Sequence, residues 1–182
     1  AIAAKKEVLI DCEHFFDGYK ANPAYATSFV ETALKAGARW VVLCDTNGGT
    51  MPSEVRDIIA ALPVDKSKLG IHAHDDTGQA VANSLAAVEA GVRQIQGTLN
   101  GIGERCGNAN LVTLIPTLLL KAHFADRFET FVKAEQLGAL THISRAFDDL
   151  LNRASNRQAP YVGASAFATK AGIHASALAK DV

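Results

Sequence analysis

The chain has 182 residues, of which 48% are hydrophobic and 20% charged, with a formal net charge of −1. This near-neutral charge argues against a nucleic acid or an acidic membrane as partner, and the longest apolar runs, such as 114–120, are too short to cross a bilayer. Three cysteines without a CxxC spacing argue against a disulfide framework and for a reducing, cytoplasmic compartment, and the first residues show no secretory signal.

The predicted elements form four successive strand–helix units. Strands are predicted from apolar runs at 8–12, 40–44, 68–74 and 93–101, and helices are predicted at 23–36, 52–62, 78–90 and 111–121. This alternation is typical of an α/β fold with a parallel sheet and helical crossovers. Four such units amount to half of an eight-stranded (β/α)8 barrel.

The character of the chain changes after residue 124. Residues 128–155 are predicted to be helical and amphipathic, and residues 156–182 to end in a helix of small residues. We therefore expect two parts: a half barrel at 1–124, and a helical linker with part of a subdomain at 125–182.

Polar residues follow each predicted strand. Ligands bind at the carboxyl ends of parallel strands. We therefore expect one mouth at which the following side chains converge: Glu13, Asp45, Thr46, His72, His74, Glu104 and Asn108.

The run IHAHDDTG suggests a metal site. Side chains alternate along a strand, so His72 and His74 point to the same side. One buried and one exposed histidine would be the ordinary alternative, but the place of the pair at a strand end favours a bound cation. Zinc suits imidazoles, whereas a harder ion would need oxygen ligands from elsewhere. Asp75 and Asp76 would orient the ligands or cap the next helix.

The other polar runs are less specific. In NGIGERCGNAN, Glu104 could orient a water or a ligand, whereas a turn with an asparagine helix cap is the ordinary alternative. Glu13 in DCEHFFDGYK could equally be a solvated loop carboxylate, and CDTNGG could be an Asx turn. The two phenylalanines of the first run are expected in the core. The three cysteines are interpreted as buried structural thiols.

Long stretches of the chain resemble a known family. The segment HAHDDTGQAVANSLAAVEAGVRQIQGTLNGIGERCGNANL is similar to the strand 7 to helix 8 region of isopropylmalate, homocitrate and citramalate synthases. These are metal-dependent, Claisen-type (β/α)8 barrels. The runs CEHFFDGYKANP, LCDTNGGTMP and PYVGASAFATKAGIHASAL most resemble the citramalate synthase branch. The resemblance extends from about residue 8 to the end and implies strands 5–8 of the barrel plus the start of the next subdomain.

The resemblance implies roles for particular residues. His72 and His74 would bind the catalytic divalent ion (Mg²⁺, Mn²⁺ or Zn²⁺), with Asn108 at or near it. Glu13 and Thr46 would contact the bound keto acid, and Glu104 would be a polar group of the active site. His174, in GIHASA, would transfer a proton in the active site of a partner subunit, which implies a homodimer.

The resemblance also implies a reaction, which is the condensation of acetyl-CoA with an α-keto acid, most simply pyruvate to (R)-citramalate. The family's Arg-Asp-Gly run at the end of strand 1, which supplies the remaining metal ligand, is absent from these residues. We therefore expect this chain alone to lack catalysis and to self-associate.

Three alternatives remain open on the sequence. The same chemistry could act on 2-oxoisovalerate or 2-oxoglutarate, giving isopropylmalate or homocitrate. An aldolase or lyase could use the same barrel, although such an enzyme would not need the appendage that carries His174. Finally, the chain could be an inactive fragment that binds a metal.

Overall fold

The computed structural model describes residues 1–169 together with residues 176 and 180. The chain divides into two compact units, residues 1–111 and 112–182, and each is described by itself. The predicted division at 124/125 stays a prediction.

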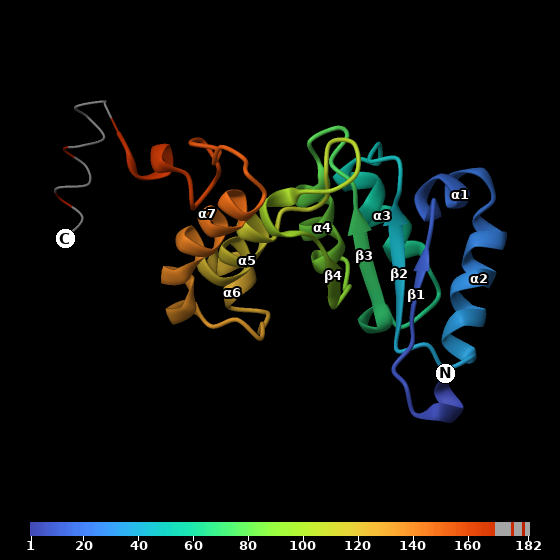
Figure 1. The fold of residues 1–182 in the computed structure, drawn as a ribbon. Coiled ribbons are helices and arrows are strands. Elements are labelled where there is room, and N and C mark those ends of the chain that lie inside the picture. Colours follow the sequence, from blue (N-terminus) through green and yellow to red (C-terminus); the bar gives the residue numbers. More distant parts are fainter. Residues whose placement is uncertain (170–175, 177–179, 181–182) are drawn as a thin grey trace. The chain divides into compact units, whose positions relative to one another are not determined.

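The first unit is built on a parallel sheet (Figure 1). Its four strands are β1 (Leu9–Cys12), β2 (Trp40–Asp45), β3 (Leu69–Ala73) and β4 (Gln94–Gln96), hydrogen-bonded in the order β1-β2-β3-β4. Every neighbouring pair is parallel, and the register places His72 between Cys44 on one side and Gln96 on the other. The predicted α/β fold with a parallel sheet is therefore confirmed.

Helices follow the strands as crossover connections. They are α1 (Phe15–Ala21), α2 (Pro23–Lys35), α3 (Pro52–Ala61) and α4 (Ala80–Glu89). The helices predicted from residues 23 and 52 do begin at Pro23 and Pro52. The Asn22 side chain caps α2 by accepting a bond from Tyr25 N–H, and Glu54 accepts from Met51 N–H at the start of α3. Helix α1 was not predicted. It is short and begins with Phe15 and Phe16, which are buried as expected, so packing on the core stabilises a segment of weak helix propensity.

The sheet has two different faces. One face packs on the helices through aliphatic side chains that alternate along the strands, among them Val41, Leu43, Leu69 and Ile71, all of them fully buried. We call this the helix face. By the same alternation the opposite, inner face carries the side chains of Asp11, Cys44, His72, Gln94 and Gln96. The inner face is thus the polar one.

The second unit is helical in its described part. It contains α5 (Leu111–Leu120, which begins at the boundary), α6 (Ala122–Ala125) and α7 (Leu140–Leu150), with a 3-10 turn at Ala134–Ala139. The predicted helix at 128–155 is therefore wrong for 128–133, where Thr130 and Val132 are poor helix formers, and for 151–155, which follow the end of α7; the 3-10 turn between contains Gly138. Within the described residues, none of the helices combines the length and apolar character that a membrane crossing needs.

Candidate functional site

The parity of the residues after each strand decides which of them share a side of the sheet. His74 follows His72 by two residues, and its ring lies beside that of His72 on the inner side. Glu13 and Thr46 lie in the turns after β1 and β2, where they contact each other. Asp45 follows the opposite parity, one residue after Cys44. The strand ends therefore present two groups of polar side chains rather than one mouth.

His72 and His74 lie side by side on the inner face. Their ring centroids are 5.2 Å apart. His74 is 9% exposed, and its Nδ1 has no hydrogen-bond partner among the described residues. Burial, with a smaller contribution from His72, lowers the pKa of His74, which favours the neutral imidazole that can offer a lone pair.

Asn108 is held beside His74 by backbone pairing. The loop after β4 runs back beside the end of β3, where Asp75 N–H donates to Gly107 C=O at 2.9 Å and Ala109 N–H donates to Ala73 C=O at 3.0 Å. Asn108 and His74 thereby form an isolated antiparallel bridge. Asn108 Nδ2 donates to Ile102 C=O, whereas its Oδ1 is buried without a partner among the described residues.

Glycine is required beside this amide. A Cβ atom at Gly103 would collide with Asn108 Nδ2. Any larger residue at this position would push the Asn108 side chain away and break its hydrogen bond to Ile102 C=O.

Glu13 and Thr46 form a second contact pair. The Thr46 hydroxyl donates to Glu13 Oε2 at 2.8 Å and accepts from His14 N–H at 2.7 Å. His14 has a positive φ of 54°, an uncommon conformation for a residue other than glycine. The turn after β1 is thus held in a strained conformation by contact with the end of β2.

Arg105 connects the loops after β2, β3 and β4. Its guanidinium binds both carboxylate oxygens of Asp76, at 2.8 and 2.9 Å, and donates to Thr46 C=O at 2.6 Å. The Arg105 hydrogen bond also lowers the pKa of Asp76. Glu104 lies beside Arg105 at 3.7 Å with its side chain 79% exposed, so within the described residues it contacts Arg105 and not the histidines.

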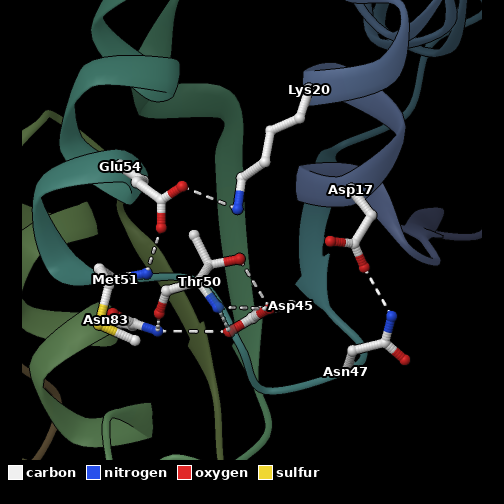
Figure 2. Close-up of polar contacts among 8 residues, drawn as sticks. All are labelled: Asp17, Lys20, Asp45, Asn47, Thr50, Met51, Glu54 and Asn83. Atoms are coloured by element: carbon white, nitrogen blue, oxygen red, sulfur yellow. Dashed lines mark hydrogen bonds and ion pairs between the residues drawn. The ribbon is translucent and has the colours of Figure 1, made fainter.

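Asp45 was expected to converge with the other polar residues at the strand ends, but its side chain binds Thr50 and Asn83 instead. It is 2% exposed, and its carboxylate accepts from Thr50 N–H, from the Thr50 hydroxyl at 2.8 Å and from Asn83 Nδ2 at 3.3 Å (Figure 2). We call Asp45, Thr50 and Asn83 the helix-side cluster. Burial raises the pKa of Asp45, against the opposing hydrogen bonds from Thr50. CDTNGG does form a turn, but it is a backbone turn in which Gly48 N–H donates to Asp45 C=O, because the Asp45 carboxylate binds Thr50 and Asn83 instead of closing an Asx turn.

Two further contacts join the β2–α3 region to α1. Asn47 Nδ2 donates to Asp17 Oδ2 at 2.7 Å, and Lys20 pairs with Glu54 at 2.9 Å (Figure 2). These bonds, with the Thr46–Glu13 bond, hold the ends of β1 and β2 together.

The cysteines divide into two kinds. Cys12 and Cys44 are buried as predicted, and burial raises the pKa of Cys12 to about 12 and that of Cys44 further still. A thiolate role is therefore disfavoured at both. The prediction is wrong for Cys106, which is exposed because it lies at the tip of the loop after β4.

The residues present fit a divalent cation. Within the described part of the chain no three His, Cys, Asp or Glu side chains stand together as a metal-binding set. The candidate set is instead His72, His74 and the amide oxygen of Asn108, and two of these residues carry buried polar atoms without a described partner. Such orphaned atoms are costly unless a ligand satisfies them.

Some relevant residues were missed by sequence reasoning, and one cannot be placed. Gln96 contacts His72, Asp11 contacts Gln96, and Arg105 contacts Thr46. Neither Asp11 nor Gln96 was singled out by a motif, and Arg105 lies in the run NGIGERCGNAN without a partner that could be predicted from the sequence. His174 lies outside the described residues.

Comparison with known proteins gives consistent relatives. A family model described as HMGL-like matches residues 1–144. The chain is 50% identical to (R)-citramalate synthase of Synechocystis sp. over 97% of its length. It is 52% identical to (R)-citramalate synthase of Aquifex aeolicus over 96%. A 2-isopropylmalate synthase of Photobacterium profundum is 40% identical over 84%. The chain covers 33% of each of the two citramalate synthases and 30% of the isopropylmalate synthase.

Solved structures share the fold. An HMG-CoA lyase from Acinetobacter baumannii, in complex with coenzyme A and 3-methylmalate, superposes with a TM-score of 0.57 at 28% identity, covering 70% of this chain and 42% of the lyase. A putative aldolase from Bacteroides vulgatus superposes with a TM-score of 0.62 at 24% identity, covering 88% of this chain and 50% of that one. At the latter identity the likeness concerns the fold alone.

Proposed function

The chain belongs to the HMGL-like family, and on this premise we propose that the intact protein containing it is an (R)-citramalate synthase. The observation that carries the proposal is the identity of about 50% to citramalate synthases along nearly the whole chain, against 40% to the isopropylmalate synthase. Because the chain spans a third of those relatives' length, the activity is that of the intact protein.

The reaction joins two small molecules through a new carbon–carbon bond. A base removes a methyl proton from the thioester of acetyl-CoA, the enolate attacks the keto carbon of pyruvate, and water hydrolyses the citramalyl thioester to release CoA. The acetyl-CoA, the keto acid and one water thus give citramalate and CoA.

We propose that His72, His74 and Asn108 hold a divalent cation, either Mg²⁺, Mn²⁺ or Zn²⁺. Support comes from the closeness of the imidazoles and from the orphaned atoms of His74 and Asn108. When bound, such an ion polarises the keto carbonyl as a Lewis acid.

Glu13 and Thr46 are proposed to contact the keto acid. The Thr46 hydroxyl is already oriented by His14 N–H, so its hydrogen can turn from Glu13 to an incoming carboxylate without movement of the backbone. Arg105 keeps the Thr46 carbonyl in place during this exchange. Glu104 is proposed as a polar group at the rim of the site, which its exposure allows.

The proton-transfer role of His174 rests on the family resemblance. We propose that His174 acts in the active site of a second subunit of a homodimer, because histidine is the side chain that most readily exchanges a proton near neutral pH. His174→Ala should lower turnover by roughly 10²–10⁴-fold and leave metal binding unchanged. Mixing this variant with the His72→Ala protein should restore activity if subunits share sites; near-normal turnover of His174→Ala would contradict the role.

A cytoplasmic location is part of the proposal. It is supported by the free thiols of Cys12, Cys44 and Cys106, which suit a reducing compartment.

The deciding experiment measures CoA thiol release by the intact protein with pyruvate, 2-oxobutyrate, 2-oxoisovalerate and 2-oxoglutarate. Pyruvate should give the highest kcat/KM, because each methylene that a pocket cannot house costs about 1–3 kcal/mol. A reaction without keto acid controls for thioester hydrolysis. Equal or better turnover with 2-oxoisovalerate would favour an isopropylmalate synthase and leave the reaction class intact, whereas no thiol release with any acid would overturn the class.

A further inference from the structure

A hydrogen-bonded chain crosses the inner face of the sheet from β1 to β3. Gln96 Nε2 donates to Asp11 Oδ1 at 2.9 Å, and Gln96 Oε1 lies 2.8 Å from His72 Nδ1. In the sheet order, β1 and β4 are the outer strands, separated by β2 and β3. A flat sheet would place them roughly 14 Å apart at ~4.8 Å per strand, beyond the reach of these two side chains. The Asp11–Gln96 bond therefore depends on the strong curvature of the sheet around the inner face.

The chemistry of Asp11 fixes the orientation of the Gln96 amide. An ionised carboxylate only accepts hydrogen bonds, so Gln96 must turn its NH₂ group toward Asp11 and its oxygen toward His72. That oxygen in turn only accepts, so His72 must carry its hydrogen on Nδ1. In the neutral ring the lone pair is then on Nε2, free for a metal.

We propose that Asp11 and Gln96 are positioning residues that hold His72 in the tautomer and ring orientation required for metal binding. The inference rests on the proposed metal site and goes beyond it, because it assigns a role to two residues that contact neither substrate nor ion. Partners of this kind raise the basicity of a ligating imidazole and restrict its rotation.

Within the described part of the chain, the neighbouring residue His74 lacks a hydrogen-bonding partner of this kind. His74 Nδ1 has no partner among the described residues, whereas His72 Nδ1 has one. Of the two imidazoles, His72 is therefore the one oriented before a metal arrives.

Gln94 supplies a matched control. It lies two residues before Gln96 on the same face of β4, opposite Gly70 in the register, and its side chain occupies the space above that glycine. Its Oε1 is buried without a described partner, and its side chain has no described link to His72. Replacing Gln94 removes an amide from the inner face without touching the Asp11–Gln96–His72 chain.

The test measures Mn²⁺ affinity of the intact protein, with free Mn²⁺ counted by electron paramagnetic resonance. Gln96→Leu should raise the Kd by about 10–100-fold, the usual cost of losing a residue that orients a metal ligand. Asp11→Ala should weaken binding less, since Gln96 remains but is free to turn. Asp11→Asn should recover part of the affinity, because its oxygen can accept from Gln96 while its NH₂ group also permits the reversed amide, and Gln94→Leu should match the wild type.

Melting temperatures of the metal-free proteins show whether each variant is folded. If Gln96→Leu fails to fold, the comparison of Asp11→Ala with Asp11→Asn tests the same chain. A Kd for Gln96→Leu equal to that of Gln94→Leu, or equal values for the two Asp11 variants, overturns the inference while the metal site stands. Unchanged Mn²⁺ binding by His72→Ala instead overturns the proposed metal site itself.

Discussion

Two polar clusters lie at the same end of the sheet and differ in how their hydrogen bonds are satisfied. In the helix-side cluster the Asp45 carboxylate accepts several bonds from Thr50 and Asn83, and all three residues are buried. On the inner side His74 Nδ1 and the amide oxygen of Asn108 have no hydrogen-bond partner among the described residues. The first cluster satisfies its carboxylate and leaves one atom, Asn83 Oδ1, without a described partner, whereas the second leaves both an imidazole nitrogen and an amide oxygen open to a ligand.

The difference teaches that the chemical type of a residue at a strand end does not decide its role. Asp45 and Thr46 are neighbours in sequence, yet one joins α3 and α4 to the sheet while the other contacts Glu13 on the inner side. If this division is right, damage to the inner face should remove function and spare the fold, and damage to the helix-side cluster should do the reverse.

The largest expected effect is the loss of the inner-face imidazoles. His72→Ala or His74→Ala should abolish stoichiometric divalent metal and lower turnover of the intact protein by more than roughly 10³-fold, because a Lewis acid supplies several kcal/mol to the reaction. The metal-free melting temperature should change little. Metal analysis and thiol release check this, with His142→Ala, an exposed histidine of α7, as control. Survival of activity and metal content in either variant contradicts the metal-site interpretation.

The next effect concerns the helix-side cluster. Asp45→Ala leaves the Thr50 N–H and the Thr50 hydroxyl without their acceptor, and Asn83 Nδ2 with Thr50 C=O as its remaining one. This costs roughly 2–4 kcal/mol when the donors stay buried. The melting temperature should fall by roughly 5–10 °C, with Mn²⁺ affinity unchanged in the folded protein. A loss of metal affinity at an unchanged melting temperature would reverse the assignment of the two clusters.

A third and smaller effect concerns the hydrogen bonds by which Arg105 connects the loops at the strand ends. Arg105→Lys loses the two parallel hydrogen bonds to Asp76, because an ammonium group cannot present two donors in one plane to both carboxylate oxygens. Because the pair is exposed to solvent, the expected effect is small, a KM for pyruvate about fivefold higher. Arg56→Lys, at an exposed pair with Asp57 on α3, is the matched control and should leave the KM unchanged. Equal KM values for the two variants would show that Arg105 does not position the site.

The smallest effect is a pair of opposite pH dependences. The pKa of Asp45 is raised from 3.8 by burial, so its contribution to stability is present below that value and is lost as the pH rises through the folded-state pKa. The melting-temperature advantage of wild type over Asp45→Asn should therefore shrink from pH 4 to pH 7.

Asp76 supplies the opposite sign. Its pKa is lowered from 3.8 by Arg105, so its contribution is present above that value and is lost as the pH falls through the folded-state pKa. The advantage of wild type over Asp76→Asn should be greatest near neutral pH and shrink below pH 4. Melting curves of the intact protein at several pH values check both slopes, and slopes of the same sign would contradict the comparison.

By itself the sequence determined the periodic features of this protein. Continuous apolar runs alternating with helical segments predicted the parallel sheet, and the two-residue period of a strand placed His72 and His74 on one side. The short helix α1 was not visible, since its two phenylalanines are stabilised by packing rather than by local propensity.

Only the tertiary structure decided which distant residues support the site. The curvature of the sheet brings Asp11 to Gln96, 85 residues later, and the loop after β4 brings Arg105 to Thr46, 59 residues earlier. The burial of Asp45 between α3 and α4 likewise depends on where those helices pack. A pattern along the chain reports the face on which a residue lies, whereas hydrogen-bond partners are set by distances in space that arise only when the sheet curves and the loops close over its end.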